Sequence, residues 1–203
     1  TGYLTVDWEK TDDVEFSKDG KTNKDVFARI PNLEILGCFN NNIKERFGNV
    51  VKRDNLALNI SNALLDGNVD FVQNKLSPLL RSFVSVRDTA TRAPHENYYH
   101  GFLNGIFTNS KDNLGEYHSN IESGDGYPDI LFKDIDCRKV AIIELKSAPT
   151  GSDLVTLSET ALSQIEEKNY SEPFMSNRMI QSIYAYGIAF SGKNCFITCK
   201  KLK

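Results

Sequence analysis

The spacing of hydrophobic residues changes along the chain and separates a helical part from a part rich in strands. Between residues 31 and 107, apolar side chains recur every three or four positions, as on one face of a helix. This spacing predicts four helices, over residues 31–47, 56–65, 70–84 and 94–107. Gly48 and the Asp66–Gly67 pair end the first two helices, and Pro94 suits the first turn of the fourth. Pro78 is expected to bend the third.

After residue 107, apolar and polar residues alternate, as they do in half-buried strands. The alternation predicts three consecutive strands that form a meander, near residues 116–122, 127–133 and 138–147. A helix over 156–170 follows, and a closing hairpin is predicted from strands at 184–190 and 195–202. Elements in this order predict an α/β (α+β) fold in which helices pack on a sheet.

The first 30 residues are expected to be separate from the main domain. Two short alternating segments, 3–6 and 25–30, enclose a charged stretch with a glycine, which predicts a β-hairpin. We expect residues 1–30 to be an extension or a linker from a preceding module. Residues 31–203 are expected to form the main domain, with a helical part at 31–92 and a core at 93–203. The absence of an initiator methionine fits a piece of a longer protein.

Composition and charge narrow the class of protein. Apolar residues make up 40% of the chain and charged residues 25%, as in ordinary folded proteins. No apolar run approaches the roughly 20 residues that span a bilayer, and no signal peptide is present, so we expect a cytoplasmic protein. The net charge of −3 argues against a uniformly basic surface but not against a local basic strip. The four cysteines lack the paired spacing of a zinc site and are expected to be reduced thiols: Cys38, Cys137, Cys195 and Cys199.

An acid and an amine interrupt the most apolar predicted strand, Val140 to Lys146. The period of two places Glu144 and Lys146 on one face, with Ile143 and Leu145 on the other. Burying two charges costs several kcal/mol unless they are paired or bind a metal. One interpretation is therefore a functional site, and the other is a Glu–Lys pair on a solvated edge strand.

A second carboxylate opens the neighbouring predicted strand. Asp129 lies fifteen positions before Glu144, a separation that a hairpin can close. Two carboxylates and a backbone carbonyl, here that of Leu145, form an oxygen site suited to Mg²⁺ or Mn²⁺. Lys146 would then lie beside the water that attacks the substrate.

These residues resemble the signature of the PD-(D/E)xK nuclease superfamily, carried here by Pro128–Asp129 and Glu144–Leu145–Lys146. The flanks are similar to one branch, the nuclease domains that follow AAA-ATPase-like modules in many bacterial proteins. The similar segments are residues 96–102, 119–124, 161–165 with Tyr170, and 186–190 with Gly192–Lys193, so that the resemblance runs over most of residues 55–200. Members of this branch often have an arginine where this chain has Tyr127 or Pro128, a departure that concerns a phosphate contact rather than the metal ligands.

The resemblance implies a restriction-endonuclease-like fold, with a mixed central sheet flanked by helices. It implies a bacterial, divalent-metal-dependent nuclease that hydrolyses phosphodiester bonds, most simply in DNA. Mg²⁺ or Mn²⁺ would be the cofactor. Nucleic acid and a fused or associated AAA-type ATPase would be the partners, and secretion into a host as an effector stays open.

Two further residues enter the expected site through the resemblance. Glu96 corresponds to an additional acidic group beside the metal, although a glutamate in a first helical turn also favours the helix dipole. Gln164, in a largely apolar helix, corresponds to a glutamine whose amide approaches the phosphate or the attacking water, and Tyr170 follows it at an unusual spacing. The expected catalytic set is therefore Asp129, Glu144, Lys146, Glu96 and Gln164, with Asp129, Glu144, Glu96 and the Leu145 carbonyl around the metal.

Other residue patterns leave few rival functions. His100 and His118 are either general bases or histidines of the core, and Glu122 is expected to be a turn residue. No G-x-S-x-G elbow supports a serine hydrolase, and no phosphate-binding glycine loop follows a strand. The chief alternative is a catalytically silent module with the nuclease fold that binds a protein partner or nucleic acid.

Overall fold

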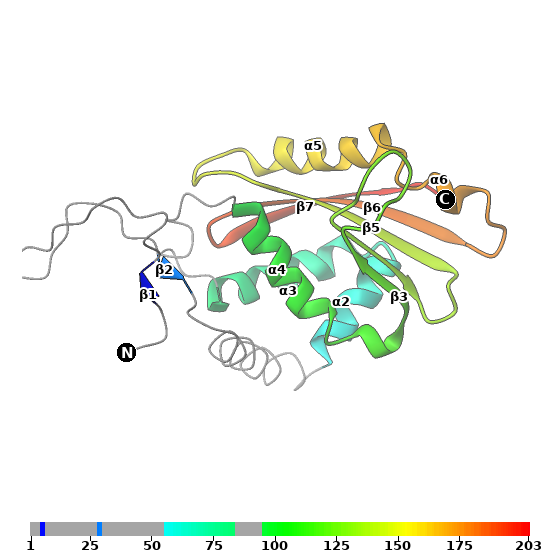
Figure 1. Ribbon diagram of the computed structural model, residues 1–203, viewed down its shortest axis with the longest axis horizontal. Helices are drawn as coiled ribbons and strands as arrows, with labels where there is room; N and C mark the ends of the chain where they lie inside the picture. The colour runs from blue at the N-terminus through cyan, green and yellow to red at the C-terminus, as the bar shows by residue number, and fades with distance from the viewer. Residues whose placement is uncertain (1–4, 7–27, 30–54, 84–94) are drawn as a thin grey trace, which may run out of the picture. The chain divides into compact units, whose positions relative to one another are not determined.

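The computed structural model describes residues 5–6, 28–29, 55–83 and 95–203 (Figure 1). The chain divides into two compact units, Thr1–Asn49 and Val50–Lys203. In the first unit, β1 (Thr5–Val6) pairs antiparallel with β2 (Ala28–Arg29), and both lie in the segments expected to form a hairpin. The helix expected over 31–47 lies outside the described residues, and the boundary expected at residue 30 stays a prediction.

A five-stranded mixed sheet is the centre of the second unit, as predicted. Its strands lie in the order β3-β4-β5-β6-β7 and span Leu114–Ser119, Ile130–Asp134, Lys139–Ser147, Ser182–Ser191 and Asn194–Lys201. The first three strands form the expected antiparallel meander, and the last two form the expected hairpin. Strands β5 and β6 are parallel, because the chain crosses back through a helix between them.

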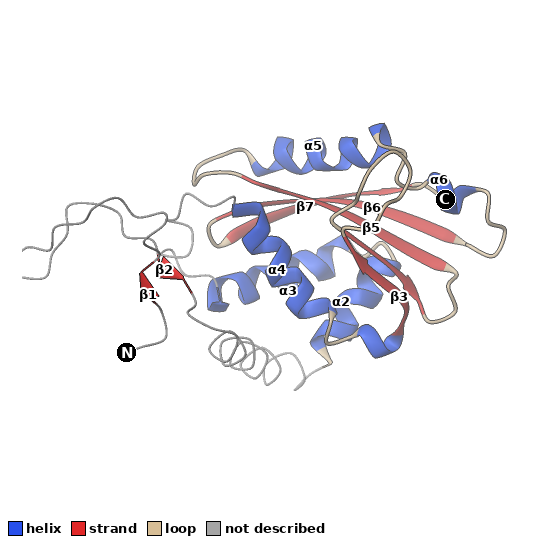
Figure 2. Cartoon of the chain, viewed as in Figure 1, coloured by secondary structure: helices blue, strands red, loops and turns tan. Residues whose placement is uncertain are grey.

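Helices cover both faces of this sheet (Figure 2). Three precede the strands and lie on one face: α2 (Leu56–Leu65), α3 (Val69–Phe83, with Pro78 inside it) and α4 (His95–Phe107). The crossover helix α5 (Leu154–Glu167) lies on the other face, where Ile165 packs in a buried cluster with Val140 and Ile142 of β5. The arrangement is the α+β sheet fold expected from the resemblance. Two short elements were not expected, the 3₁₀ turn η1 (Lys111–Asn113) and α6 (Glu172–Met175).

Helix α5 begins and ends earlier than its hydrophobic pattern suggested. Asp153 caps its N-terminus, since the carboxylate accepts hydrogen bonds from the backbone N–H groups of Val155 and Thr156. The expected start at Thr156 was therefore two residues late. At the other end, Asn169 has a left-handed backbone (φ 51°), which breaks the helix before the expected end at Tyr170.

The boundaries of the first two long strands also differ from expectation. Strand β3 ends at Ser119, and β4 begins only at Ile130. Between them, Asn120 has a left-handed backbone (φ 55°), and an isolated bridge joins Ser123 to Gly126, so this stretch is a structured loop rather than strand. Asp129 consequently lies immediately before β4 instead of inside it.

Two expectations from composition concern the cysteines and membrane-spanning helices. Cys137, Cys195 and Cys199 are free thiols, as expected, whereas Cys38 lies outside the described part of the chain. None of the helices described here has the length and apolar character needed to cross a membrane.

Candidate active site

The residue just before β4 lies beside the C-terminal part of β5. This arrangement brings together the two expected metal ligands, Asp129 and Glu144. Strands β4 and β5 pair with Ile130 opposite Ile143, so the next residues outward, Asp129 and Glu144, are neighbours. Asp129 is fixed there because its Oδ2 accepts a 2.7 Å hydrogen bond from the Leu145 backbone N–H. The hairpin therefore closes the fifteen-residue separation as expected.

Glu144 is a buried carboxylate in the middle of the sheet. Only 4% of the residue is exposed, and β5 lies between β4 and β6, so the interpretation as an exposed pair on an edge strand is wrong. Its Oε2 is buried without a hydrogen-bond partner. Burial, together with the negative charge of Asp129, raises the pKa of Glu144 to about 8.

Lys146 lies on the same face of β5 as Glu144, as the period of two predicted. Its Nζ is 3.6 Å from Glu144 Oε1, and the side chain is half-buried. The ammonium group lowers the pKa values of Glu144, Asp129 and Glu96 against the larger upward effect of burial. One cation thus interacts with all three carboxylates.

Helix α5 supplies a polar group to this otherwise apolar face. Gln164 Nε2 donates a short hydrogen bond to Glu144 Oε1 and also lies 3.5 Å from the hydroxyl oxygen of Tyr170. Tyr170 itself is buried. The amide of Gln164 therefore holds one oxygen of Glu144 and leaves the other, Oε2, without a partner.

Glu96 approaches from the opposite face of the sheet, on the first turn of α4. Burial raises its pKa, Lys146 lowers it, and Asp129 raises it. A hydrogen bond from the Ser147 backbone also acts on this carboxylate. The charges of Asp129 and Lys146 act on the Glu96 carboxyl, so Glu96 lies within electrostatic reach of the two.

Helix α4 also holds Asp129 through a network that the sequence did not reveal. His100 Nε2 lies 3.0 Å from the Asp129 carbonyl oxygen, and since a carbonyl only accepts, the imidazole donates. Ser119 Oγ lies 2.9 Å from the same nitrogen and accepts a 3.1 Å hydrogen bond from Asn104 Nδ2. Asn104 Oδ1 in turn accepts a short hydrogen bond from the Tyr117 hydroxyl. His100 thus holds the backbone of Asp129 through a hydrogen bond.

The two other residues weighed from the sequence have different surroundings. His118 lies 3.6 Å from Glu116 on β3, and both residues are half-buried. Glu122 is exposed in the loop between β3 and β4. Neither has a recorded contact with the described carboxylates of the cluster.

The cluster fits a divalent cation of the hard type. Leu145 directs its N–H toward Asp129, and because N–H and C=O of one residue lie on the same edge of a strand, its carbonyl faces that side too. Within the described residues no three Asp, Glu, His or Cys side chains gather into a closed metal site. Two carboxylates, a carbonyl and waters suffice for Mg²⁺, which keeps several waters in protein sites. The partnerless Oε2 of Glu144 is the atom that such an ion would satisfy.

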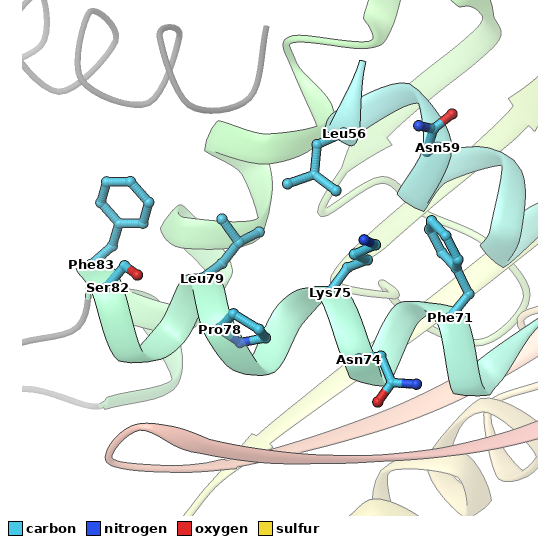
Figure 3. Close-up of a pocket in the computed structure, with 9 residues that line it drawn as sticks. All are labelled: Leu56, Asn59, Phe71, Asn74, Lys75, Pro78, Leu79, Ser82 and Phe83. Carbon is cyan, nitrogen blue, oxygen red and sulfur yellow. The ribbon is translucent and has the colours of Figure 1, made fainter. Parts of the chain in front are cut away.

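A pocket elsewhere in the unit has a different character (Figure 3). It has a volume of about 460 Å³ and is lined by residues of α2 and α3, among them Leu56, Phe71, Pro78 and Leu79. Among the described residues that line it, Lys75 alone is charged, so they offer no carboxylate pair, and none of them belongs to the cluster.

The part of the chain that holds the cluster matches a known protein family. A family model described as the PD-(D/E)XK nuclease superfamily matches residues 94–200, more than half of the chain. The matched range contains Glu96, Asp129, Glu144, Lys146 and Gln164. No curated protein and no solved structure matches the chain.

Proposed function

Because this chain belongs to the PD-(D/E)XK nuclease superfamily, we propose that it is a divalent-metal-dependent nuclease that hydrolyses phosphodiester bonds in DNA. The reactive centre is the cluster of Asp129, Glu144 and Lys146, with Glu96 and Gln164 in support. Mg²⁺ is the proposed cofactor, and Mn²⁺ is its substitute.

The buried Glu144 carboxylate is the observation that carries this proposal. An ionised carboxylate that is 4% exposed, beside a second carboxylate, is costly unless a cation accompanies it. Lys146 contacts only Oε1, at 3.6 Å, and Oε2 has no partner. A site built for a bound cation explains an arrangement that would otherwise destabilise the fold.

Each side chain has a role in this proposal. Asp129, Glu144 and the Leu145 carbonyl hold the ion, and the amide of Gln164 keeps Glu144 in one orientation. Lys146 places a positive charge beside the attacking water and the scissile phosphate, where negative charge develops. The water oxygen forms a bond to phosphorus, and the bond from phosphorus to the leaving sugar oxygen breaks. Glu96 supports the ion directly or through water.

A bound divalent ion would lower the pKa of the nucleophilic water and neutralise charge on the phosphate. At neutral pH the raised pKa of Glu144 leaves much of that carboxyl protonated. Ion binding therefore requires Glu144 to lose its proton.

The partner and setting follow from the same resemblance. We propose nucleic acid as the substrate partner and an AAA-type ATPase module, fused or associated, as the protein partner. The cytoplasm of a bacterium is the proposed location.

Cleavage of DNA by the purified protein tests the proposed function. With Mg²⁺ or Mn²⁺ the chain should degrade DNA, and EDTA should abolish the activity. Asp129→Asn and Lys146→Met should each lower the rate at least about a hundredfold, the loss typical when one charge-stabilising group is removed. Glu159→Gln, an exposed position on α5, is the matched control and should keep full activity.

Circular dichroism should show that all three variants fold. Cleavage that persists in EDTA and in Asp129→Asn would remove the assigned site. A folded protein that binds DNA but never cleaves it would instead favour the silent binding module.

A further inference from the structure

The loop that leads into Asp129, residues 120–128, is called the rim loop here, and it is held in place at several points. The backbone N–H of Asn120 donates to the Asp129 carbonyl at 3.1 Å and closes the loop. The Ser123 hydroxyl donates to the Tyr170 carbonyl at 2.8 Å, and the Asp125 N–H donates to the C-terminal end of α5. The rim loop is therefore a preformed edge of the site.

One aromatic ring projects from this edge into solvent. Tyr127 is 59% exposed, and in the described part of the chain it has no recorded hydrogen bond or ring contact. Its neighbours face inward: Pro128 is buried, and a Cβ on Gly126 would lie 3.1 Å from the Tyr170 ring. Tyr127 precedes a proline, where the backbone is extended, and it lies two positions before Asp129.

The position of Tyr127 sets it apart from other exposed apolar side chains. Two residues span at most about 7 Å, so its Cα lies within that distance of Asp129. The other large exposed apolar residues of the described chain lie on other segments: Ile135, Val155, Met175, Met179 and Phe196.

The charge of the rim loop indicates what this edge contacts. It carries Glu122 and Asp125, both exposed, and contains no lysine or arginine. Phosphate binding needs cationic side chains, so the rim loop is unsuited to hold the backbone of a nucleic acid. An exposed aromatic ring, in contrast, stacks on the face of a nucleobase, whatever the base.

We propose that Tyr127 stacks on an unpaired nucleobase next to the scissile phosphate, and that the substrate is single-stranded or locally unpaired DNA. This inference rests on the proposed function. Bases inside a duplex are already stacked on both faces, so the ring finds a free base face only where pairing is lost. The rim loop thus selects the strand state of the substrate.

Binding in EDTA separates this inference from catalysis, because no cleavage then occurs. A fluorescently labelled 20-nucleotide single strand and its blunt duplex are titrated with the protein, and anisotropy is measured. Tyr127→Ala should weaken binding to the single strand about tenfold, within the range of one base–aromatic contact. Tyr127→Phe should bind like the unaltered chain, and duplex binding should not change. Phe196→Ala removes an exposed ring on β7 and is the matched control.

With Mg²⁺ present, the unaltered chain should cleave the single strand faster than the duplex, and Tyr127→Ala should lose that preference through a higher KM. Equal single-strand binding by the unaltered chain and Tyr127→Ala would overturn the role of Tyr127. Faster cleavage of the duplex would overturn the substrate class. If no nucleic acid is cleaved but Tyr127→Ala still weakens single-strand binding, the stacking role stands and the proposed nuclease activity fails.

Discussion

Glu144 combines three properties that rarely occur together in one carboxylate: burial in a central strand, a neighbouring acid and an oxygen without a partner. Each property raises the free energy of the ionised form. On the proposed function, the same oxygens are the ones a cation needs, so the residue would couple stability to metal binding.

A prediction for the metal-free protein follows from the raised pKa. The folded-state pKa of Glu144, about 8, lies above its ordinary value of 4.5. Between these pH values the folded protein keeps a proton that the unfolded chain has released, so the free energy of unfolding falls as pH rises. Glu144→Gln removes this loss and should be more stable than the unaltered chain at pH 8, on the order of 1–3 kcal/mol, with a smaller gain at pH 5.

Urea unfolding at both pH values, in EDTA, measures this difference. Glu159→Gln, at an exposed position, should show no pH-dependent gain. The same gain for Glu144→Gln at pH 5 and pH 8 would show that a property other than ionisation is responsible.

The sequence predicted the centre of this cluster better than its surroundings. A period of two suffices to place Glu144 and Lys146 on one face, and a hairpin suffices to bring Asp129 beside them. The contacts of His100 with the Asp129 carbonyl and Ser119 join a helix to a loop and a strand. Such contacts depend on how the elements pack, which local periodicity does not encode.

At the scale of elements, the approach of α5 to the sheet decides whether Gln164 reaches Glu144. Strands β5 and β6 pair with Glu144 opposite Gly187. A Cβ on Gly187 would overlap the Ser158 carbonyl oxygen and crowd the Leu162 nitrogen of α5. The absence of a side chain there lets the helix backbone lie directly against the strand.

Gly187→Ala should therefore separate α5 from the sheet. We expect a loss of about 1–3 kcal/mol in the free energy of unfolding, the usual cost of overpacking, together with reduced nuclease activity. Gly101→Ala is the matched control, since a Cβ there meets nothing within 4 Å, and alanine in a helix should stabilise the protein slightly. Chemical denaturation compares the two variants, and unchanged stability of Gly187→Ala would refute the close approach.

Element boundaries were harder to predict than element types. Helix α5 starts earlier than the apolar pattern predicted, because the carboxylate of Asp153 caps the helix just before Leu154. Residues 120–122 and 127–129 were expected to be strand, yet they belong to a loop that is held by the Ser123–Gly126 bridge and by hydrogen bonds to Tyr170 and Lys168. A local cap decided the first case, and hydrogen bonds to residues distant in sequence decided the second.

For the described part of the second unit as a whole, the mixed sheet explains why one site draws residues from both layers. Strand β5 ends between α4 on one face and α5 on the other (Figure 2). Glu96 and His100 therefore reach the cluster from one layer and Gln164 from the other. The pattern of helices and strands predicted the class, and the family resemblance implied a mixed sheet. The parallel pairing of β5 and β6 was not predicted, because pairing direction is a long-range property.

Anomalous scattering from a crystal grown with Mn²⁺ tests the central claim most directly. We predict a peak that contacts carboxylate oxygens of Asp129 and Glu144 and the Leu145 carbonyl at about 2.0–2.2 Å, close to the spacing of small divalent ions in oxygen sites, and no such peak in Asp129→Asn. A well-ordered crystal at saturating Mn²⁺ with no peak between Asp129 and Glu144 would contradict the assignment.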